Sequence, residues 1–226
     1  MNLDPKVSAV KNRLKQVKRI IAVSGFKGGV GKSSIACILA LLLAKAGKKT
    51  GLMDLDFNGD SCAAILGVKQ EFPEEIFGLT PPIISGVKLM TPAFFSQKKA
   101  INLRGAEITN VILELAAVTQ WGELDFLILD MPPGFADAAL DIIRFMPQAK
   151  VLLVKTPSVL SKTLVERAQS VLKTLNVSIM GEIENLSARG LPYDDTLEAA
   201  YGNPEKLKAT PLALALEKQI PKLFNI

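Results

Sequence analysis

Short apolar runs alternate with longer segments of helical periodicity along the chain. An apolar run without polar alternation is typical of a parallel strand that helices cover on both faces. We expect such strands over 20–24, 50–55, 87–90, 126–129, 151–154 and 178–183. We expect helices over 33–46, 109–119 and 160–175. The alternation predicts an α/β fold with a doubly wound, mostly parallel sheet and helices on both faces.

Residues 1–18 are predicted to form a basic amphipathic helix. The dipeptide Asp4-Pro5 supplies a capping carboxylate and then a proline for the first turn. Apolar side chains follow at helical spacing, at Val7, Val10, Leu14 and Val17. The basic face of this helix either is solvated or contacts a membrane surface or another polyanion.

The net charge of +5 comes from the same segment. Residues 1–19 hold six Lys or Arg and one acid, so 27 minus 6 basic residues and 22 minus 1 acidic residues remain, and these cancel. A broad basic face is therefore not expected, and nucleic acid is not an expected partner.

Composition limits the remaining possibilities. A hydrophobic fraction of 49% and a charged fraction of 22% fit one globular domain over residues 1–226. The absence of histidine leaves acid–base chemistry to carboxylates, lysines and hydroxyls. The two cysteines, Cys37 and Cys62, form no CxxC pair, and the longest apolar run, 35–44, is about half the length of a membrane span. With no secretory signal pattern, we expect a reduced, cytoplasmic compartment.

A glycine-rich loop, KGGVGKSS over 27–34, lies between the first strand and the first long helix. Glycines let backbone N–H groups turn toward phosphate oxygens, and the start of a helix adds positive potential. Lys32 is placed to reach the terminal phosphates, and the Ser33 hydroxyl to bind Mg²⁺. The alternative is a glycine-rich turn without a ligand. The predicted phosphate-binding residues are Gly28, Gly29, Val30, Gly31, Lys32, Ser33 and Ser34.

Carboxylates follow two of the predicted strands. Asp54 and Asp56 are two positions apart at one strand end, and Asp130 ends the apolar run 126–129. Parallel sheets place ligands at the carboxyl ends of their strands. These acids are therefore candidates for a Mg²⁺ site, the alternative for Asp54 and Asp56 being solvated loop acids.

The segment KGGVGKS resembles the deviant Walker A motif of the MinD/ParA/Mrp superfamily, although Phe26 stands where the usual pattern has its first glycine. The resemblance implies ATP as the nucleotide, Mg²⁺ as the cofactor and a homodimer with nucleotide between the subunits. It implies catalytic roles for Lys32 and for Lys27, which would reach the partner's phosphates and stabilise transition-state charge. Without a dimer, Lys27 is a local phosphate contact or a surface lysine.

Further segments resemble the Mrp branch of this superfamily, namely DLDFNGDS, LDMPPG and ENLS. The resemblance implies that Asp54 holds a Mg²⁺-bound water and that Asp56 positions the attacking water. It implies that Asp130 binds Mg²⁺ through water and that Pro133 contacts the nucleotide. Asn185 would contact adenine, although an asparagine after a strand is also a common turn residue.

The chain departs from the Mrp pattern in two places. Phe135 and Ala136 replace Thr and Gly after the LDMPPG segment, and residues 186–200 lack the CxxC that holds a bridging iron–sulfur cluster in typical Mrp proteins. Cys37 lies in an apolar helix and Cys62 follows the Asp54 segment, so both are expected to be buried structural thiols. We expect no stable bridging cluster.

The sequence thus predicts a Mg²⁺-dependent, slow ATPase of Mrp type that works as a nucleotide-controlled dimeric switch. Its partner would be a client protein, in metal-cofactor or iron–sulfur protein assembly. Two alternatives stay open: a MinD/ParA-like positional ATPase that acts on membrane or DNA, and a nucleotide sensor without turnover. The tail over 216–226 is short for a MinD-type membrane helix, and Pro221 is expected to interrupt it.

Overall fold

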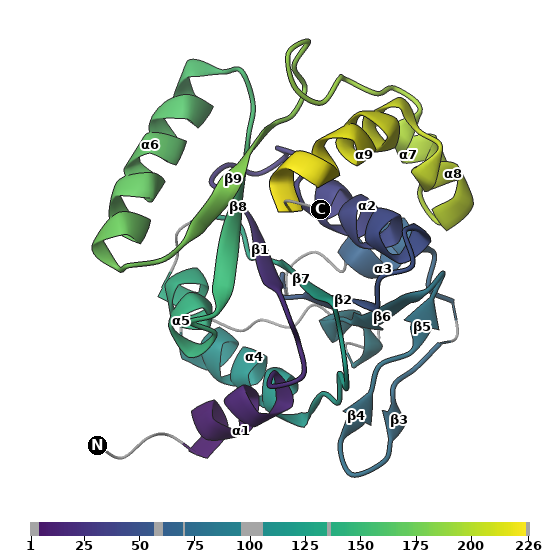
Figure 1. Ribbon diagram of the computed structural model, residues 1–226, viewed down its shortest axis with the longest axis vertical. Helices are drawn as coiled ribbons and strands as arrows, with labels where there is room; N and C mark the ends of the chain where they lie inside the picture. Colours follow the sequence, from purple (N-terminus) through teal and green to yellow (C-terminus); the bar gives the residue numbers. More distant parts are fainter. Residues whose placement is uncertain (1–4, 57–60, 70, 96–105, 135–136, 225–226) are drawn as a thin grey trace.

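The computed structural model describes residues 5–56, 61–69, 71–95, 106–134 and 137–224. Within these residues, seven strands form one sheet in the order β5-β6-β2-β7-β1-β8-β9 (Figure 1). All neighbours in the sheet are parallel except the edge pair β5 and β6. The strands are β1 (Ile20–Gly25), β2 (Thr50–Asp54), β5 (Ile83–Ile84), β6 (Val87–Met90), β7 (Phe126–Asp130), β8 (Ala149–Lys155) and β9 (Ile179–Glu184).

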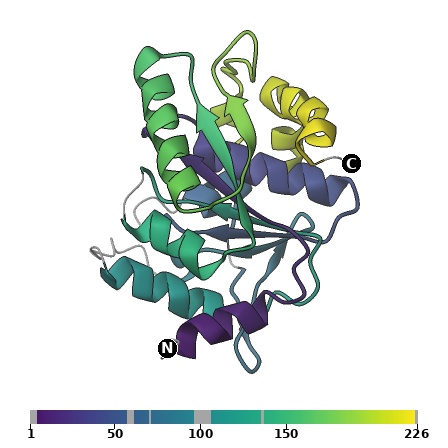
Figure 2. The ribbon, with the colours of Figure 1, turned by 60° about the vertical axis from the view of Figure 1, so that its left-hand side comes forward.

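Helices cover both faces of this sheet, as the sequence predicts (Figures 1 and 2). One face carries α1 (Pro5–Arg13), α4 (Ala106–Val118), α5 (Asp137–Phe145) and α6 (Val159–Thr174). The other carries α2 (Lys32–Lys45), α3 (Ser61–Leu66), α7 (Leu197–Ala200), α8 (Pro204–Lys208) and α9 (Pro211–Phe224). The chain leaves β1 toward β2 through α2, but later passes from β7 to β8 on the far side of β1. The sheet therefore reverses its winding beside β1, and such a reversal is where α/β sheets bind ligands.

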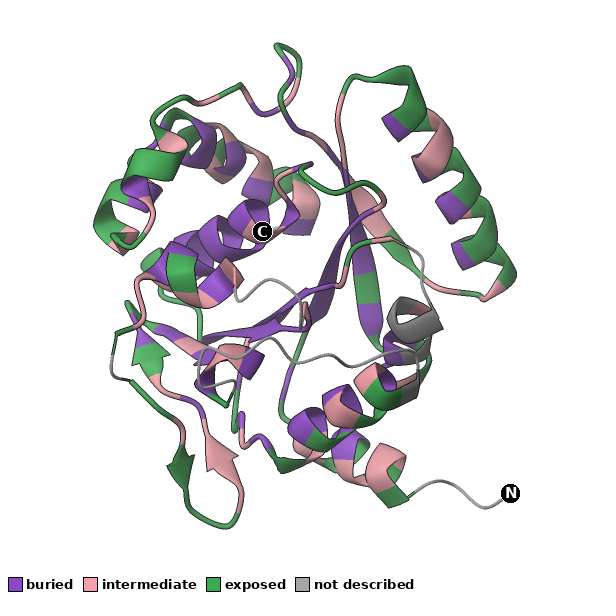
Figure 3. Ribbon diagram, turned by 180° about the vertical axis from the view of Figure 1, so that it is seen from behind, coloured by how far each residue is buried: buried purple, intermediate pink, exposed green. Residues whose placement is uncertain are grey.

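The helix α2 lies at the centre of the molecule. Its apolar run from Ile35 to Leu43 is buried throughout, because the sheet covers one side and α9 the other (Figure 3). The helix α9 contributes buried side chains that include Leu212, Leu216 and Phe224. This packing fixes the start of α2, and so fixes the glycine-rich loop that precedes it.

The expectation that Pro221 interrupts the tail is wrong. The helix α9 runs through Pro221 to Phe224. A proline removes one helical N–H, and this close to the end of a helix only the carbonyl of Glu217 loses its partner. The apolar face of the tail helix is used in the core, and no helix within the described residues is long and apolar enough to cross a membrane.

The N-terminal helix is shorter than the predicted 1–18. Of the residues that the structure describes, Pro5–Arg13 form the helix. Beyond it, Val17 forms a parallel bridge with Leu124, which requires extended backbone before β1 begins. The predicted apolar stripe is nevertheless found on the core side, since Val10 is 0% and Leu14 is 2% exposed.

Several short elements were not predicted. They are the exposed hairpin of β3 (Glu74–Glu75) and β4 (Leu79–Thr80), the 3-10 helix Pro92–Phe94, the edge strand β5, and the helices α3, α7 and α8. Each has two to six residues, which is too short to show hydrophobic periodicity.

Candidate functional site

The glycine-rich loop lies at the carboxyl end of β1. Gly29 and Gly31 have positive φ, at 76° and 84°, a conformation that glycine adopts at least cost. A Cβ atom placed on Gly28 or on Gly29 would meet no atom within 4 Å. The loop is therefore an open cradle of backbone groups before the start of α2, and its shape fits a phosphate group.

Lys32 joins this loop to the end of β7. Its Nζ atom lies 2.6 Å from Asp130 Oδ1 and 3.3 Å from Ser33 Oγ. Both partners of the ion pair are buried, since the Lys32 side chain is 8% and Asp130 0% exposed. A buried ammonium needs a charged partner. In this structure Asp130 is that partner, and a phosphate in the cradle would offer another.

Asp54 lies beside Asp130 in the register of β2 and β7 and is fully buried. Its carboxylate accepts hydrogen bonds from Asp56 N at 3.0 Å and Cys62 N at 3.4 Å, and from the Thr91 hydroxyl at 3.2 Å. Burial first, and the neighbouring Asp130 charge second, raise the pKa of Asp54 to about 7. The carboxylates of Asp54 and Asp130 can together carry two negative charges, and the Lys32 ammonium balances one of them. This fits the predicted Mg²⁺ role of Asp54 and Asp130.

The other predicted residues surround this centre. Lys27 is exposed and forms no hydrogen bond or ion pair with any described residue. Asp56 is half-buried at the end of β2. The Ser34 hydroxyl is paired with the Tyr201 hydroxyl at 2.7 Å, so Ser34 offers a phosphate its backbone N–H rather than its side chain. Tyr201 was not predicted.

The segment after β7 is tied to the end of β1. Met131 N donates to Val23 O at 3.1 Å, and Gly134 N to Gly25 O at 3.2 Å. Pro133 is exposed between these two contacts. The divergent residues 135–136 that follow lie outside the described residues.

Asn185 lies against the glycine-rich loop. It is 2% exposed, its Nδ2 donates to Val30 O at 2.9 Å, and a Cβ on Gly31 would lie 2.4 Å from Nδ2. Its Oδ1 is buried and has no hydrogen-bond partner among the described residues. A buried carbonyl oxygen without a partner is rare, and the exocyclic amine of adenine is a donor that would satisfy it.

The two cysteines lie close to each other beside these carboxylates. The sequence alone does not predict that proximity. Both are fully buried, and the two thiols lie close enough for each to influence the pKa of the other. Cys62 Sγ also lies 3.5 Å from Asp130 Oδ2. Burial raises the pKa of Cys37, and the neighbouring Cys37 thiol together with burial raises the pKa of Cys62. The expectation of two buried thiols is confirmed, but they are neighbours of the carboxylates.

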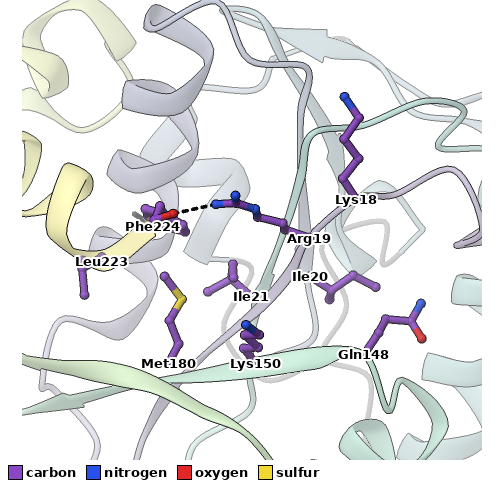
Figure 4. A pocket seen from close by; sticks show the side chains of 9 residues that line it. All are labelled: Lys18, Arg19, Ile20, Ile21, Gln148, Lys150, Met180, Leu223 and Phe224. Carbon is purple, nitrogen blue, oxygen red and sulfur yellow. Dashed lines mark hydrogen bonds between the residues drawn. The ribbon is translucent and has the colours of Figure 1, made fainter. Parts of the chain in front are cut away.

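A cavity lies at the opposite end of the strands from the glycine-rich loop, beside the amino ends of β1 and β8 (Figure 4). It has a volume of about 350 Å³, and its cationic lining residues are Lys18, Arg19 and Lys150. Arg19 donates to Phe224 O at 2.8 Å. None of the predicted site residues lines this cavity, so it is separate from the phosphate cradle.

Comparison with known proteins gives the family. The profile of a family described as NUBPL iron-transfer P-loop NTPase matches residues 16–221. An iron–sulfur cluster carrier protein of Saccharolobus solfataricus is 34% identical over 218 residues, which is 94% of this chain and 74% of that protein. A protein of the same name from Mycobacterium tuberculosis is 32% identical over 209 residues, or 92% of this chain and 55% of its own length. The chain thus spans about half the length of the mycobacterial relatives it matches.

Solved structures of nucleotide-binding proteins have a similar fold. A nucleotide-binding protein from Archaeoglobus fulgidus in complex with ADP superposes with a TM-score of 0.78 at 26% identity, covering 92% of this chain and 95% of that one. The septum site-determining protein MinD from Pyrococcus horikoshii, complexed with Mg-ADP, shares the fold at a TM-score of 0.64 and 19% identity, covering 91% and 96%. The chain therefore belongs to the NUBPL-type iron-transfer P-loop NTPases, the Mrp-like branch of the MinD/ParA superfamily.

Proposed function

We propose that this protein binds ATP with Mg²⁺, hydrolyses it slowly, and uses the nucleotide to control a homodimeric switch in the cytoplasm. The observation that carries the proposal is the open glycine cradle with Lys32 and two buried carboxylates at its inner end. That combination supplies backbone donors, one mobile cation and two acceptors for metal-bound water, which are the parts that phosphoryl transfer requires.

Lys32 would leave Asp130 and turn to the terminal phosphates, exchanging one anion for another. The Ser33 hydroxyl would bind Mg²⁺, while Asp54 and Asp130 would accept hydrogen bonds from metal-bound water. The Mg²⁺ ion would neutralise charge that develops on the transferred phosphoryl group. Asp56, at the mouth of the site, would orient the attacking water.

Asn185 would hold the base. Its Oδ1 lacks a donor within the described residues, and its Nδ2 is already held by Val30 O. With the amide held in this orientation, Oδ1 would be the atom that accepts a hydrogen bond from the base. This favours adenine, which presents an amine, over guanine, which presents a carbonyl oxygen at the same ring position.

Lys27 would contact the phosphates of the nucleotide bound to the partner subunit. Its exposure and its lack of partners within the described residues suit a lysine that reaches outward across an interface. A cation supplied in trans would stabilise transition-state charge only in the dimer. Nucleotide binding, dimerisation and turnover would then be linked.

The client would be a protein in metal-cofactor or iron–sulfur protein assembly. Relatives over most of the chain are named iron–sulfur cluster carrier proteins. This chain has only two cysteines, Cys37 and Cys62, and both are buried, so it offers no CxxC of its own. The switch would therefore act on a client rather than hold a bridging cluster through a CxxC pair.

Substitution of Gly28 by alanine tests nucleotide binding cleanly. An added methyl group meets no protein atom, so stability should not change, but it takes up space in the cradle. We expect the affinity for Mg-ATP, measured by calorimetry, to fall at least about tenfold, or about 1.4 kcal/mol. Unchanged affinity would show that phosphate does not bind in this loop.

Two further variants separate binding from turnover. Lys32→Ala should abolish measurable ATP binding, because the charge-assisted contacts to phosphate are lost. Asp56→Ala should bind ATP normally and hydrolyse it much more slowly. Normal hydrolysis by Asp56→Ala would remove the water-positioning role.

A further inference from the structure

The thiol of Cys62 lies beside the carboxylates of Asp54 and Asp130, next to the glycine-rich loop. The Cys62 thiol and the carboxylates of Asp54 and Asp130 each place one ligand atom within 4.8 Å of the other two. All three residues are fully buried. They come from three separate elements, α3, β2 and β7, so the fold rather than a local motif brings them together.

The spacing fits a first-row divalent ion. With metal–sulfur bonds of about 2.3 Å and metal–oxygen bonds of about 2.1 Å, two ligands on a tetrahedral edge lie about 3.6 Å apart. Cys62 Sγ and Asp130 Oδ2 are 3.5 Å apart. The remaining pairs, which are at most 4.8 Å apart, would close by at most about 1.4 Å around an ion, a shift that side-chain rotations supply.

The ligands are already oriented. Asp54 accepts hydrogen bonds from Cys62 N and from the Thr91 hydroxyl, which fix the plane of its carboxylate. A second buried thiol, that of Cys37 in α2, lies close enough to Cys62 to raise its pKa. Contacts of this kind hold metal ligands in place in other proteins. The cluster therefore contains more than two acids and a single cysteine.

The charges balance with such an ion. Binding would break the S–H bond of Cys62, form a metal–sulfur bond and release the proton to solvent. The thiolate and two carboxylates then carry three negative charges, and a divalent ion with the Lys32 ammonium carries three positive charges. Mg²⁺ strongly prefers oxygen ligands in octahedral geometry, so the sulfur selects against it.

We propose that Asp54, Cys62 and Asp130 form a binding site for a thiophilic divalent ion of the Zn²⁺, Co²⁺ or Fe²⁺ class. The site differs in ligand set from the nucleotide-bound Mg²⁺ proposed above, which uses the Ser33 hydroxyl. It shares two carboxylates with that machinery, and it does not require nucleotide. The neighbouring Cys37 thiol or a water molecule would supply the fourth ligand.

Cobalt titration of the intact protein, without nucleotide, tests the proposal. Thiolate ligation of Co²⁺ gives a sulfur-to-metal charge-transfer band in the near ultraviolet. We expect this band to saturate at one Co²⁺ per chain, to survive a large excess of Mg²⁺, and to disappear when Zn²⁺ is added. No band, or loss of the band in Mg²⁺, would overturn the proposal in the unmodified protein, whatever the variants do.

Matched thiol substitutions assign the ligand. Cys62→Ser should lower the Co²⁺ affinity on the order of 100-fold and remove the band, whereas Cys37→Ser, equally buried, should keep the band. Circular dichroism confirms that each variant is folded. A band that depends on Cys37 and not on Cys62 would refute the assignment. Since no nucleotide is present, failure here leaves the proposed ATP binding untouched, and failure of ATP binding leaves this result standing.

Discussion

Asp54 should make the nucleotide-free protein less stable as its carboxyl group ionises. The pKa of Asp54 is raised from 3.8 to about 7, mainly by burial and then by the Asp130 charge. Between these two values the folded protein holds a proton that the unfolded chain has released. The free energy of unfolding contributed by this group is therefore highest below pH 3.8 and falls as pH rises to about 7.

The magnitude follows from the shift. Each pKa unit is worth about 1.4 kcal/mol, so a shift of about three units corresponds to about 4 kcal/mol at pH 8. The near-isosteric variant Asp54→Asn removes the charge, but its amide cannot accept from all three present donors, which costs about 1 kcal/mol or more. We expect Asp54→Asn to be about 2–3 kcal/mol more stable than the wild type at pH 8.

Urea denaturation of the nucleotide-free protein at pH 5 and at pH 8 measures this effect. The stabilisation by Asp54→Asn should be present at pH 8 and largely absent at pH 5. The exposed residue Asp195 provides a control, since Asp195→Asn should change the stability by less than about 0.5 kcal/mol at either pH. A variant Asp54→Asn that is destabilised equally at both pH values would refute the reasoning.

Three further changes test separate contacts. Gly31→Ala should destabilise the protein by about 1–3 kcal/mol and weaken ATP binding, because φ is 84° and the new methyl group would meet Asn185 Nδ2; unchanged melting would contradict the loop geometry. Tyr201→Phe should cost about 1 kcal/mol by removing the partner of the Ser34 hydroxyl, with no such cost in a Ser34→Ala background. Pro221→Ala should stabilise α9 by about 1 kcal/mol, and a loss of stability would show that the ring packs in the core.

The parts of the fold that depend on local pattern could be predicted from the sequence. The six main strands are apolar runs that a parallel sheet buries, and the strand Val87–Met90 was predicted to the residue. The glycine-rich loop could be located because its residues are consecutive and lie between an apolar strand and a long apolar helix. The short elements could not, because an element such as β5 (two residues) or α7 (four residues) is too short to show a hydrophobic periodicity.

Within the site, too, the residues that a local sequence pattern marks could be predicted, and the contacts between distant segments could not. Asp54 and Asp130 were predicted because each ends an apolar strand, and the register of β2 and β7 places them side by side. The contacts of Thr91 with Asp54, of Tyr201 with Ser34, and between the two cysteines join segments far apart in the chain. A single sequence carries no signal for such pairs, since neither partner has an unusual spacing.

Molar mass by light scattering tests the central claim most directly. The protein would be measured with Mg²⁺ and ADP, and again with Mg²⁺ and a non-hydrolysable ATP analogue. A monomer with ADP and a dimer with the analogue, lost in Lys27→Ala, is the result that the nucleotide-controlled switch predicts. A monomer in both states, with the analogue shown to be bound, would contradict the role of Lys27 in trans and with it the dimeric switch.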